Sequence, residues 1–453
     1  MAGAAAGAAR QVKTFVLRSR LNSPKLTAAL TAVAYYLFIV LRLSTHGYDV
    51  SYFVTAGDQF NDPQLVPKNL QVSRDSAGYD GQFYYRLALD PFTAQRTAFG
   101  NTLDLPATRQ SRIGYPLLVW LLSLRHAELV PALMLAVNFV ALCAMGWMGG
   151  LIAQSLKRHA LWGLAFPFFA GSLITLSRDL TEILAMCVVL AALLTIRRGH
   201  DGLAVVLLTV AAFTRETTLV VIASVLLVRV AERNYKFLLA LQIFVRTSIL
   251  SLTSILSLSK DAIHDRAPHG STEPVLSLSK DSPCLSSHEF HSQVSRPTFL
   301  YLLPLGAYAL WSLWLSARWG QATFGYAALT LGFPLTGFMS FLFSTTAFAN
   351  RYQVVWFSQL CFIVAFAVAC AWAWRTSRAL AHEKLAWLLY GVFAALWSAY
   401  IWVEDWAYLR QLSEFYLFGA LILLGSSSRV KFPIVAASVA VWLVLAREII
   451  WFR

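Results

Sequence analysis

The chain has 453 residues, of which 58% are hydrophobic and only 13% are charged. The charged fraction is about half that of an ordinary soluble domain, which excludes a water-soluble globular fold. The net charge of +14 could indicate a nucleic-acid partner. The basic residues, however, stand at the ends of apolar runs and form no single patch, so we predict no nucleic-acid binding.

The N-terminal segment 1–25 is basic, and an apolar run at 26–43 follows it. The segment contains five basic residues and no acidic residue. Because the positive-inside rule keeps such a segment in the cytoplasm, we predict a cytoplasmic N-terminus. No small-residue cleavage site follows the apolar run, so 26–43 is predicted to be a retained membrane span.

A polar segment at 44–112 follows the first span and is therefore predicted to lie on the extracytoplasmic side. It contains seven aspartates and no glutamate, and it is long enough to fold. The next apolar run, 113–124, has about twelve residues, which is too short to cross about 30 Å of hydrocarbon. We interpret this run as a re-entrant or interfacial helix.

Further apolar runs recur to the end of the given sequence, and we interpret them as spans because the lysines and arginines that flank them then fall on the cytoplasmic side. Together with the first span they predict an all-α polytopic membrane protein with about eleven spans, within a range of about ten to thirteen. A second re-entrant segment at 332–343 is interrupted by Pro334 and Gly337. The predicted spans are 26–43, 129–153, 160–176, 182–196, 202–214, 217–232, 298–316, 352–374, 385–402, 411–426 and 432–449.

The segment 247–297 differs from these runs because it is rich in serine. It contains Leu-Ser-Leu-Ser-Lys-Asp twice, at 256–261 and 276–281, and two copies cannot bury a core. We predict a disordered cytoplasmic insertion between an N-terminal membrane module at 26–246 and a C-terminal one at 298–453. The repeat also resembles translated mobile repeat elements inserted in bacterial genes, which implies no function of its own.

Charged residues that do not flank spans on the cytoplasmic side fall on the predicted outer side, in four separate segments. An ionised side chain at mid-membrane costs about 2.5–3.5 kcal/mol on insertion scales, so a functional role is the default interpretation. Simpler roles stay open for two segments: helix capping at 178–182 and an internal ion pair that tightens a helix hairpin at 214–217. The candidate residues are Asp49, Asp58, Asp80, Arg178, Asp179, Glu182, Arg215, Glu216, Glu404, Asp405 and Arg410.

The segment 78–85, Gly-Tyr-Asp-Gly-Gln-Phe-Tyr-Tyr, places one carboxylate between glycines and aromatic residues. Aromatic rings can stack on sugar rings, and a carboxylate beside them can accept a hydroxyl proton during glycosyl transfer. The glycines allow a close backbone approach. We therefore predict Asp80 as a catalytic base and Tyr79, Phe83 and Tyr84 as a sugar platform. The alternative is an interfacial aromatic belt with an aspartate in a turn.

The segment 79–88 resembles the aspartate-glycine-aromatic segment of GT-C membrane glycosyltransferases, including GPI-type mannosyltransferases. The segments 178–182, 214–217 and 402–406 are similar to those of uncharacterised bacterial proteins implicated in cell-surface glycopolymer formation. The resemblance covers most of the chain outside the insertion and implies a GT-C-like fold in the bacterial cytoplasmic membrane. It also implies transfer of a sugar from a polyprenyl-phosphate donor to a glycan, lipid or protein acceptor on the outer face.

Many GT-C enzymes carry paired acidic residues in the first loop, whereas Asp80 has only Asp75 nearby, so Asp49 stays a rival base. In the predicted mechanism, Arg178 and Arg215 bind the donor phosphate, and direct displacement inverts the anomeric carbon. Supporting residues that would orient these arginines are Asp179, Glu182 and Glu216. Residues that would bind acceptor or phosphate are Glu404, Asp405 and Arg410. No metal site or other cofactor is required, although a divalent cation could join carboxylates and phosphate.

Two other classes of membrane protein are weighed against this prediction. A transporter or lipid-linked glycan flippase would also need charged groups in membrane cavities, but such proteins often show internal repeats and paired broken helices, which this sequence lacks. An O-antigen ligase or polymerase also combines many spans with outer arginines, but its large late outer loop is missing. A membrane glycosyltransferase is therefore favoured, with membrane lipids and a polyprenyl-phosphate-linked sugar as partners.

Overall fold

The computed structural model describes residues 22–233, 298–324, 330–345, 351–403 and 407–452. The chain divides into two compact units, one made of 1–225 and 300–453 and the other of 226–299. Every site discussed below lies in the first unit. The predicted basic N-terminus, apart from its last four residues, and the serine-rich insertion lie outside the described residues.

The described part is mostly helical, and five of its helices are long and apolar enough to cross a membrane. Shorter apolar helices accompany them, and together they indicate a multi-pass membrane protein. The long segments comprise α2 (Pro24–Ser44), η2 (Ala127–Leu129) with α6 (Val130–Ser155), η6 (Thr298–Tyr301) with α12 (Leu302–Trp319), α15 (Arg351–Ala373) and α20 (Lys431–Phe452).

The remaining apolar helices are shorter than the five long ones. Five of them lie close to predicted spans: α8 (Glu182–Arg197), α9 (Asp201–Thr214), α10 (Leu219–Arg233), α16 (Ala381–Ala395) and α19 (Ser413–Gly425). Two others, α5 (Gly114–Ser123) and α14 (Thr336–Thr345), lie at the segments that the sequence analysis interprets as re-entrant. A helix of ten residues rises about 15 Å, about half of the hydrocarbon thickness.

Two predicted spans are not continuous helices, and the prediction is wrong at these points. The segment 160–176 consists of η3 (Ala160–Ala165) and α7 (Ala170–Leu176), separated by a turn at Pro167, which has no N–H to donate. The segment 385–402 is divided between α16 and α17 (Ala399–Val403), because Trp397 leaves the helix to form a β-bridge with Leu331. The short helix α18 (Ala407–Gln411) follows.

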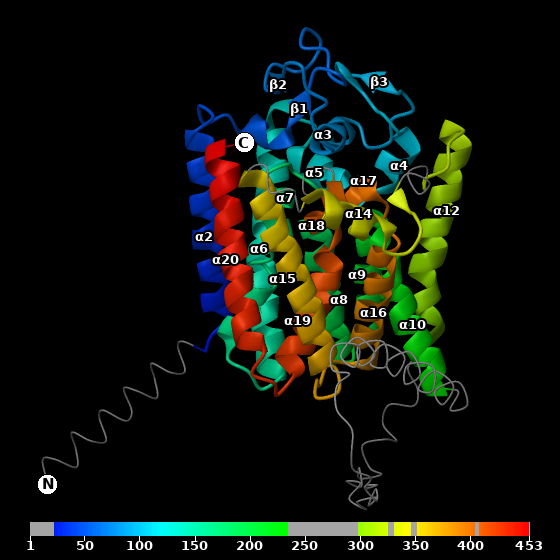
Figure 1. Ribbon diagram of the computed structural model, residues 1–453. Coiled ribbons are helices and arrows are strands. Elements are labelled where there is room, and N and C mark those ends of the chain that lie inside the picture. Colours follow the sequence, from blue (N-terminus) through cyan, green and yellow to red (C-terminus); the bar gives the residue numbers. More distant parts are fainter. Residues whose placement is uncertain (1–21, 234–297, 325–329, 346–350, 404–406, 453) are drawn as a thin grey trace, which may run out of the picture. The chain divides into compact units, whose positions relative to one another are not determined.

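Helix α2 packs against both α6 and α20 (Figure 1). A Cβ on Gly146 of α6 would lie 2.5 Å from the hydroxyl oxygen of Thr31 in α2, so only glycine allows this approach. On the other side, the indole N–H of Trp442 in α20 donates a hydrogen bond of 3.1 Å to the hydroxyl of Tyr35. The first and last long helices are therefore joined by both packing and hydrogen bonding.

Residues 44–112 fold as a small layer at one end of the helices of the first unit (Figure 1), and we call it the outer layer after its predicted side of the membrane. Its core is formed by the buried rings of Tyr84, Tyr85 and Tyr115, together with Leu70 and Met134. The layer contains η1 (Val50–Val54), the parallel pair β1 (Ala56–Gly57) and β2 (Val72–Ser73), α3 (Gly81–Leu89), the hairpin β3 (Thr97–Ala98) and β4 (Asn101–Thr102), and α4 (Pro106–Ser111). This layer contributes Tyr79, Asp80 and Arg109 to the candidate site.

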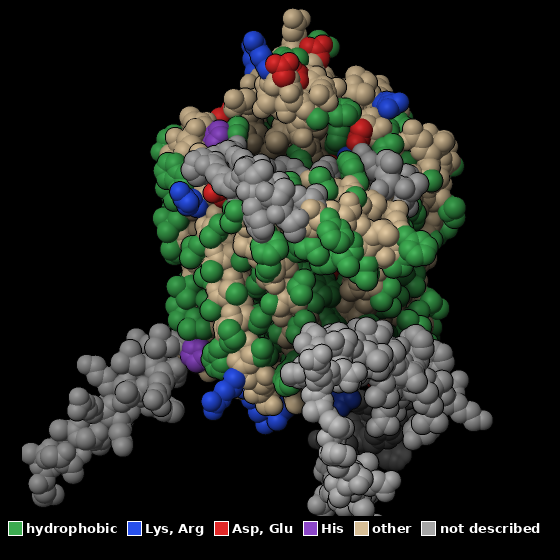
Figure 2. Space-filling model, viewed as in Figure 1, with side chains coloured by type: hydrophobic (Ala, Val, Ile, Leu, Met, Phe, Trp, Pro, Cys, Tyr) green, Lys and Arg blue, Asp and Glu red, His purple; other side chains and the backbone are tan. Residues whose placement is uncertain are grey.

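Basic side chains gather at the opposite end of these helices (Figure 2). The guanidinium of Arg158 and the ammonium of Lys431 both donate to the carbonyl oxygen of Ser426, at 2.6 and 2.8 Å. Arg197 forms a bidentate ion pair with the buried carboxylate of Glu383. Hydrophobic side chains cover the helices between the two ends (Figure 2), as expected for a surface in contact with lipid.

Candidate functional site

The motif Gly-Tyr-Asp-Gly stands at the start of α3, and its glycines allow it to pack directly on neighbouring backbone. Gly78 has a φ of +64°, a left-handed conformation that favours glycine. A Cβ on Gly81 would lie 2.2 Å from the carbonyl oxygen of Arg178, in the segment between α7 and α8. This close approach holds Tyr79 and Asp80 next to that segment.

Replacing Gly81 with alanine is expected to lower the free energy of unfolding by about 1–3 kcal/mol, because the added methyl group overpacks the contact with Arg178. Thermal unfolding of the purified protein in detergent measures the effect. Gly202→Ala is the matched control, because a Cβ at this helical glycine of α9 would meet open space. Equal melting temperatures for the two variants would contradict the close packing at Gly81.

The carboxylate of Asp80 lies between two guanidinium groups. Its oxygens are 2.8 Å from Nη1 of Arg109 and 2.9 Å from Nη1 of Arg410. Arg109 also donates two hydrogen bonds to Asp104, at 2.9 and 2.7 Å. Burial raises the pKa of Asp80, but Arg109 and Arg410 lower it by more, so the net pKa lies well below its usual value. Asp80 is therefore ionised at neutral pH.

Arg410 connects Asp80 to a second set of buried ion pairs. Its Nη1 lies 3.2 Å from Oε1 of Glu182, and the same oxygen lies 2.6 Å from Nη1 of Arg215. Arg215 also lies 3.2 Å from Glu414. We call the residues Asp80, Arg109, Glu182, Arg215, Arg410 and Glu414 the buried charge network. The structure thus brings together four of the predicted candidates from four separate segments of the chain.

Glu216 points to a partner that the sequence analysis does not include. Its carboxylate accepts two hydrogen bonds from Arg112, at 2.8 and 2.5 Å, and Arg112 also donates to the hydroxyl of Tyr84 at 2.9 Å. Arg112 and Glu216 line a cavity of about 280 Å³ together with Trp397 and Gln411. The sequence analysis leaves open that 214–217 forms an ion pair that tightens a helix hairpin. Glu216 does form an ion pair, but its partner Arg112 comes from the outer layer and not from the hairpin.

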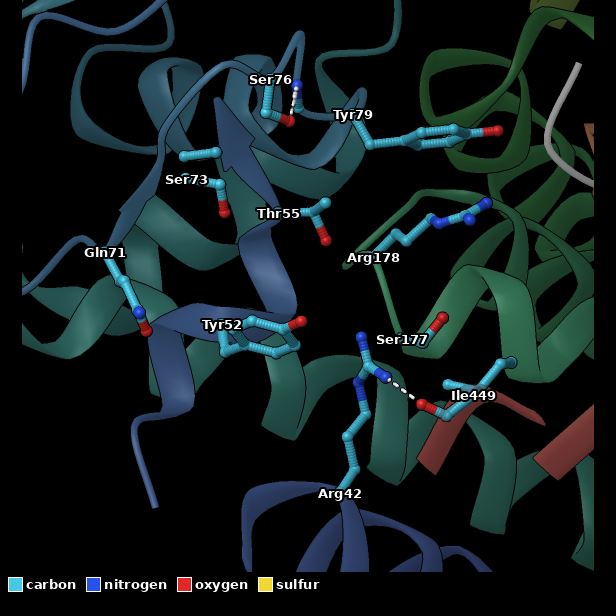
Figure 3. Close-up of a pocket in the computed structure, with 12 residues that line it drawn as sticks. Arg42, Tyr52, Thr55, Gln71, Ser73, Ser76, Tyr79, Ser177, Arg178 and Ile449 are labelled. Carbon is cyan, nitrogen blue, oxygen red and sulfur yellow. Dashed lines mark hydrogen bonds between the residues drawn. The ribbon is translucent and has the colours of Figure 1, made fainter. Parts of the chain in front are cut away.

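Arg178 lies in a different place from Arg215, in a cavity of about 270 Å³ that it shares with Arg42 (Figure 3). We call this space the arginine cavity. Arg42 extends from the last turn of α2 and donates a hydrogen bond of 2.7 Å to the carbonyl oxygen of Ile449 in α20. Tyr52 and Thr55 also line this cavity, and in Figure 3 their hydroxyl groups lie to one side of the two guanidinium groups. Further polar lining residues are Gln71, Ser73, Ser76 and Ser177.

The ring of Tyr79 joins the arginine cavity to the buried charge network. The guanidinium carbon of Arg178 lies 4.2 Å from its centroid, and that of Arg410 lies 5.1 Å from it. Tyr79 also lines the arginine cavity, and Figure 3 shows its ring above Arg178. Two cationic side chains from distant segments are therefore held against one aromatic ring, with the carboxylate of Asp80 on the next residue.

The other two residues of the predicted sugar platform belong to the core of the outer layer. The ring of Phe83 is 3% exposed and packs edge-on against Phe60 at 5.3 Å. Tyr84 is 1% exposed and packs against Tyr115 at 6.3 Å. Since protein atoms cover both rings, they offer no open face for a sugar in this structure, and Tyr79 alone of the three borders a cavity.

The remaining acidic candidates have other surroundings. Asp49 is exposed and caps η1 by accepting a hydrogen bond of 2.9 Å from the N–H of Ser51. Like Asp80, it lines none of the three cavities described in the structure. Asp179 is fully buried with a φ of +47°, and burial raises its pKa well above the usual value. Glu404 and Asp405 lie outside the described residues.

Sequence reasoning does not single out Arg42, Arg109, Arg112 or Glu414. A signal for Arg42 exists: it stands at the outer end of the first predicted span, where the positive-inside rule does not expect an arginine. Arg109 and Arg112 stand three residues apart in the polar segment before α5, Arg109 within α4 and Arg112 directly after it. No sequence signal pairs them with Asp80 and Glu216, because these contacts depend on the tertiary fold.

The candidate site thus consists of the arginine cavity, the buried charge network and the ring of Tyr79 between them. Apart from Arg42, its charged residues lie in the outer layer, in the connectors that hold Arg178 and Arg215, in the short helix α18, or in the first turns of α8 and α19. Within the described ranges, no three His, Cys, Asp or Glu side chains are grouped as metal ligands. No protein-family model, no curated protein and no solved structure matches the chain.

Proposed function

We propose that this chain is a membrane glycosyltransferase with a GT-C-like fold and about eleven membrane segments. It would transfer a sugar from a polyprenyl-phosphate donor to a glycan, lipid or protein acceptor on the outer face of the bacterial cytoplasmic membrane. The observation that carries the proposal is the arginine cavity, in which Arg42 and Arg178 meet at the end of a long apolar helix. The cavity combines cationic and hydroxyl groups, which suits a phosphate ester with an attached sugar.

The pair of arginines proposed to bind phosphate is Arg42 and Arg178. The sequence analysis pairs Arg178 with Arg215, but Arg215 is 1% exposed and is enclosed by Glu182 and Glu414, which already balance its charge. Arg42, by contrast, makes its one described side-chain hydrogen bond to an uncharged carbonyl group, and its Nε has no hydrogen-bond partner in the described part of the chain. A phosphate at this position would leave its polyprenyl chain at the level of the outer end of α2.

The proposed reaction is a direct displacement. The acceptor hydroxyl oxygen attacks the anomeric carbon, the bond between this carbon and the phosphate oxygen breaks, and the phosphate keeps the bonding electron pair. Asp80 accepts the hydroxyl proton as the new bond forms. Because its pKa is low, Asp80 then passes the proton to the released phosphate, whose second pKa is about 6. The product has the inverted anomeric configuration, and the reaction requires no cofactor.

The test is transfer of a labelled sugar from a polyprenyl-phosphate donor to acceptor by the purified protein in liposomes. Arg42→Gln and Arg178→Gln are each expected to raise the donor KM about 10- to 100-fold, because a hydrogen bond to a charged group contributes about 1.5–3 kcal/mol. Arg318→Gln is the matched control: this arginine also donates to a backbone carbonyl, that of Phe92, and is exposed.

Three results would count against the proposal. An unchanged donor KM in both variants would show that the arginine cavity does not bind the donor. No transfer by the wild-type protein with any of a panel of polyprenyl-phosphate sugars would remove the proposed activity. Movement of intact donor across the liposome membrane without sugar transfer would favour the flippase alternative.

A further inference from the structure

A third cavity lies in the outer layer, away from the charge network. It has a volume of about 820 Å³ and is lined by the segments 58–63 and 97–100, together with Leu65 and Thr102. Its polar lining includes Asp58 and Asp62, and its apolar lining includes Phe99, whose side chain is 48% exposed. We call it the outer groove. Its volume falls within the range of about 300–1,000 Å³ that is typical of ligand sites.

Phe99 holds an unfavourable backbone conformation at the edge of this groove. It forms, with Gly100, the two-residue loop of the β3–β4 hairpin, and both residues have positive φ, at 51° and 71°. Loops of this kind favour asparagine followed by glycine, because a bulky residue with positive φ is strained. Asparagine at position 99 would adopt this backbone conformation with less strain than phenylalanine. Strain of about 1–3 kcal/mol at a single residue points to a role for its side chain.

The ring of Phe99 is supported from within the protein. The guanidinium carbon of Arg86 lies 5.0 Å from the ring centroid, and Arg86 itself is fully buried. Its Nη2 donates a hydrogen bond of 2.9 Å to the hydroxyl of Thr93. Contact with Arg86 fixes the ring in place, while nearly half of its surface stays open to the groove and solvent. A pre-positioned open aromatic face loses little conformational entropy on binding.

The two carboxylates of the groove are charged and accessible. Asp58 accepts hydrogen bonds from the backbone N–H groups of Ser76 and Asp75, at 3.0 and 2.9 Å, and these bonds lower its pKa. Asp62 accepts a hydrogen bond from the N–H of Gln64. Because each carboxylate has further lone pairs, both can accept hydrogen bonds from ligand hydroxyl groups. Their charge disfavours phosphate and anionic lipid.

We propose that the outer groove binds a neutral glycan, with one sugar ring stacked on Phe99 and its hydroxyl groups donating to Asp58 and Asp62. The ligand would be a distal part of the acceptor chain, whose growing end reaches Asp80. This identification of the ligand as acceptor rests on the proposed function. The binding itself does not, because it depends only on the chemistry of the groove.

The test compares Phe99→Asn with Phe99→Tyr in two measurements. The first is binding of soluble neutral hexose oligosaccharides to the purified protein, followed by NMR line broadening of the sugar protons. The second is the acceptor KM in the liposome transfer assay. Phe99→Asn is expected to weaken binding about 3- to 10-fold and to raise the acceptor KM by the same factor with unchanged kcat. Phe99→Tyr keeps the ring and is expected to behave as wild type.

Phe92→Asn is the matched control, because Phe92 is 50% exposed in the same layer but does not line the groove. Unchanged binding in Phe99→Asn would overturn the inference, as would equal losses in Phe99→Asn and Phe99→Tyr, or tighter binding of oligosaccharides that carry a uronic acid. A purely structural Phe99 predicts a change in melting temperature without a change in binding. These outcomes are separate from those of Arg42→Gln and Arg178→Gln, which test donor binding and the proposed function.

Discussion

Replacing Arg215 with alanine is expected to lower the free energy of unfolding by about 3–5 kcal/mol, the range measured when one partner of a buried ion pair is removed. The reason is that Glu182 and Glu414 are each 1% exposed and both lie against Arg215. Without it, both buried carboxylates would lose an ion-pair partner, although Glu182 would keep Arg410. Chemical or thermal unfolding in detergent micelles measures the loss.

Two further variants test whether the loss of stability comes from unpaired charge. Arg125→Ala removes an exposed arginine and is expected to change stability by less than about 0.5 kcal/mol. The triple variant Arg215→Met, Glu182→Gln, Glu414→Gln removes the charges together and is expected to recover part of the lost stability. If the single and triple variants unfold at the same temperature, the loss comes from packing and not from unpaired charge.

Replacing Asp80 with asparagine is expected to reduce sugar transfer about 100- to 10,000-fold, the usual contribution of a positioned acid or base. The free energy of unfolding is expected to fall much less than in Arg215→Ala, because Arg109 keeps its two hydrogen bonds to Asp104 and Arg410 keeps its ion pair with Glu182. The liposome transfer assay at saturating donor measures the first effect and thermal unfolding the second. Asp49→Asn tests the rival base, and loss of transfer in that variant alone would reverse the assignment.

The same variant is expected to change how stability depends on pH. The pKa of Asp80 is lower in the folded protein than the value of about 3.9 in an unfolded chain. Its contribution to stability is therefore fully present above pH about 4 and is lost as the pH falls through the folded pKa. Asp80→Asn removes this contribution, so the variant is expected to lose less stability between neutral and acid pH than the wild type.

Helix positions could be predicted where the length of an apolar run alone decides them. The run 202–214 becomes α9 at Asp201–Thr214, and 26–43 becomes α2 at Pro24–Ser44. The run 160–176 shows the opposite case, because composition cannot reveal that the chain turns at Pro167 and continues as two short helices. Hydropathy measures the free energy of transfer into lipid. A segment that is buried among other helices can be as apolar as a span without crossing the membrane, so hydropathy does not distinguish the two.

The sequence predicts which segments contribute to the candidate site, but it does not predict which of their side chains contact one another. Charge patterning assigns Asp80, Glu182, Arg215 and Arg410 to one side, and the structure joins them in one network. The partner of Glu216 is Arg112, 104 positions earlier in the chain, and no local spacing rule connects residues so far apart. Burial likewise separates Tyr79 from Phe83 and Tyr84, although all three belong to one short aromatic motif.

The hydrogen bond from Arg42 to the carbonyl oxygen of Ile449 has a consequence for biosynthesis. Arg42 belongs to α2, but its acceptor, Ile449 of α20, is synthesised 407 residues later. Until α20 inserts and packs beside α2, one wall of the arginine cavity does not exist. Chains that lack α20 would therefore carry the Arg42 guanidinium without a finished pocket, so packing of α20 against α2 is expected to complete the proposed phosphate site.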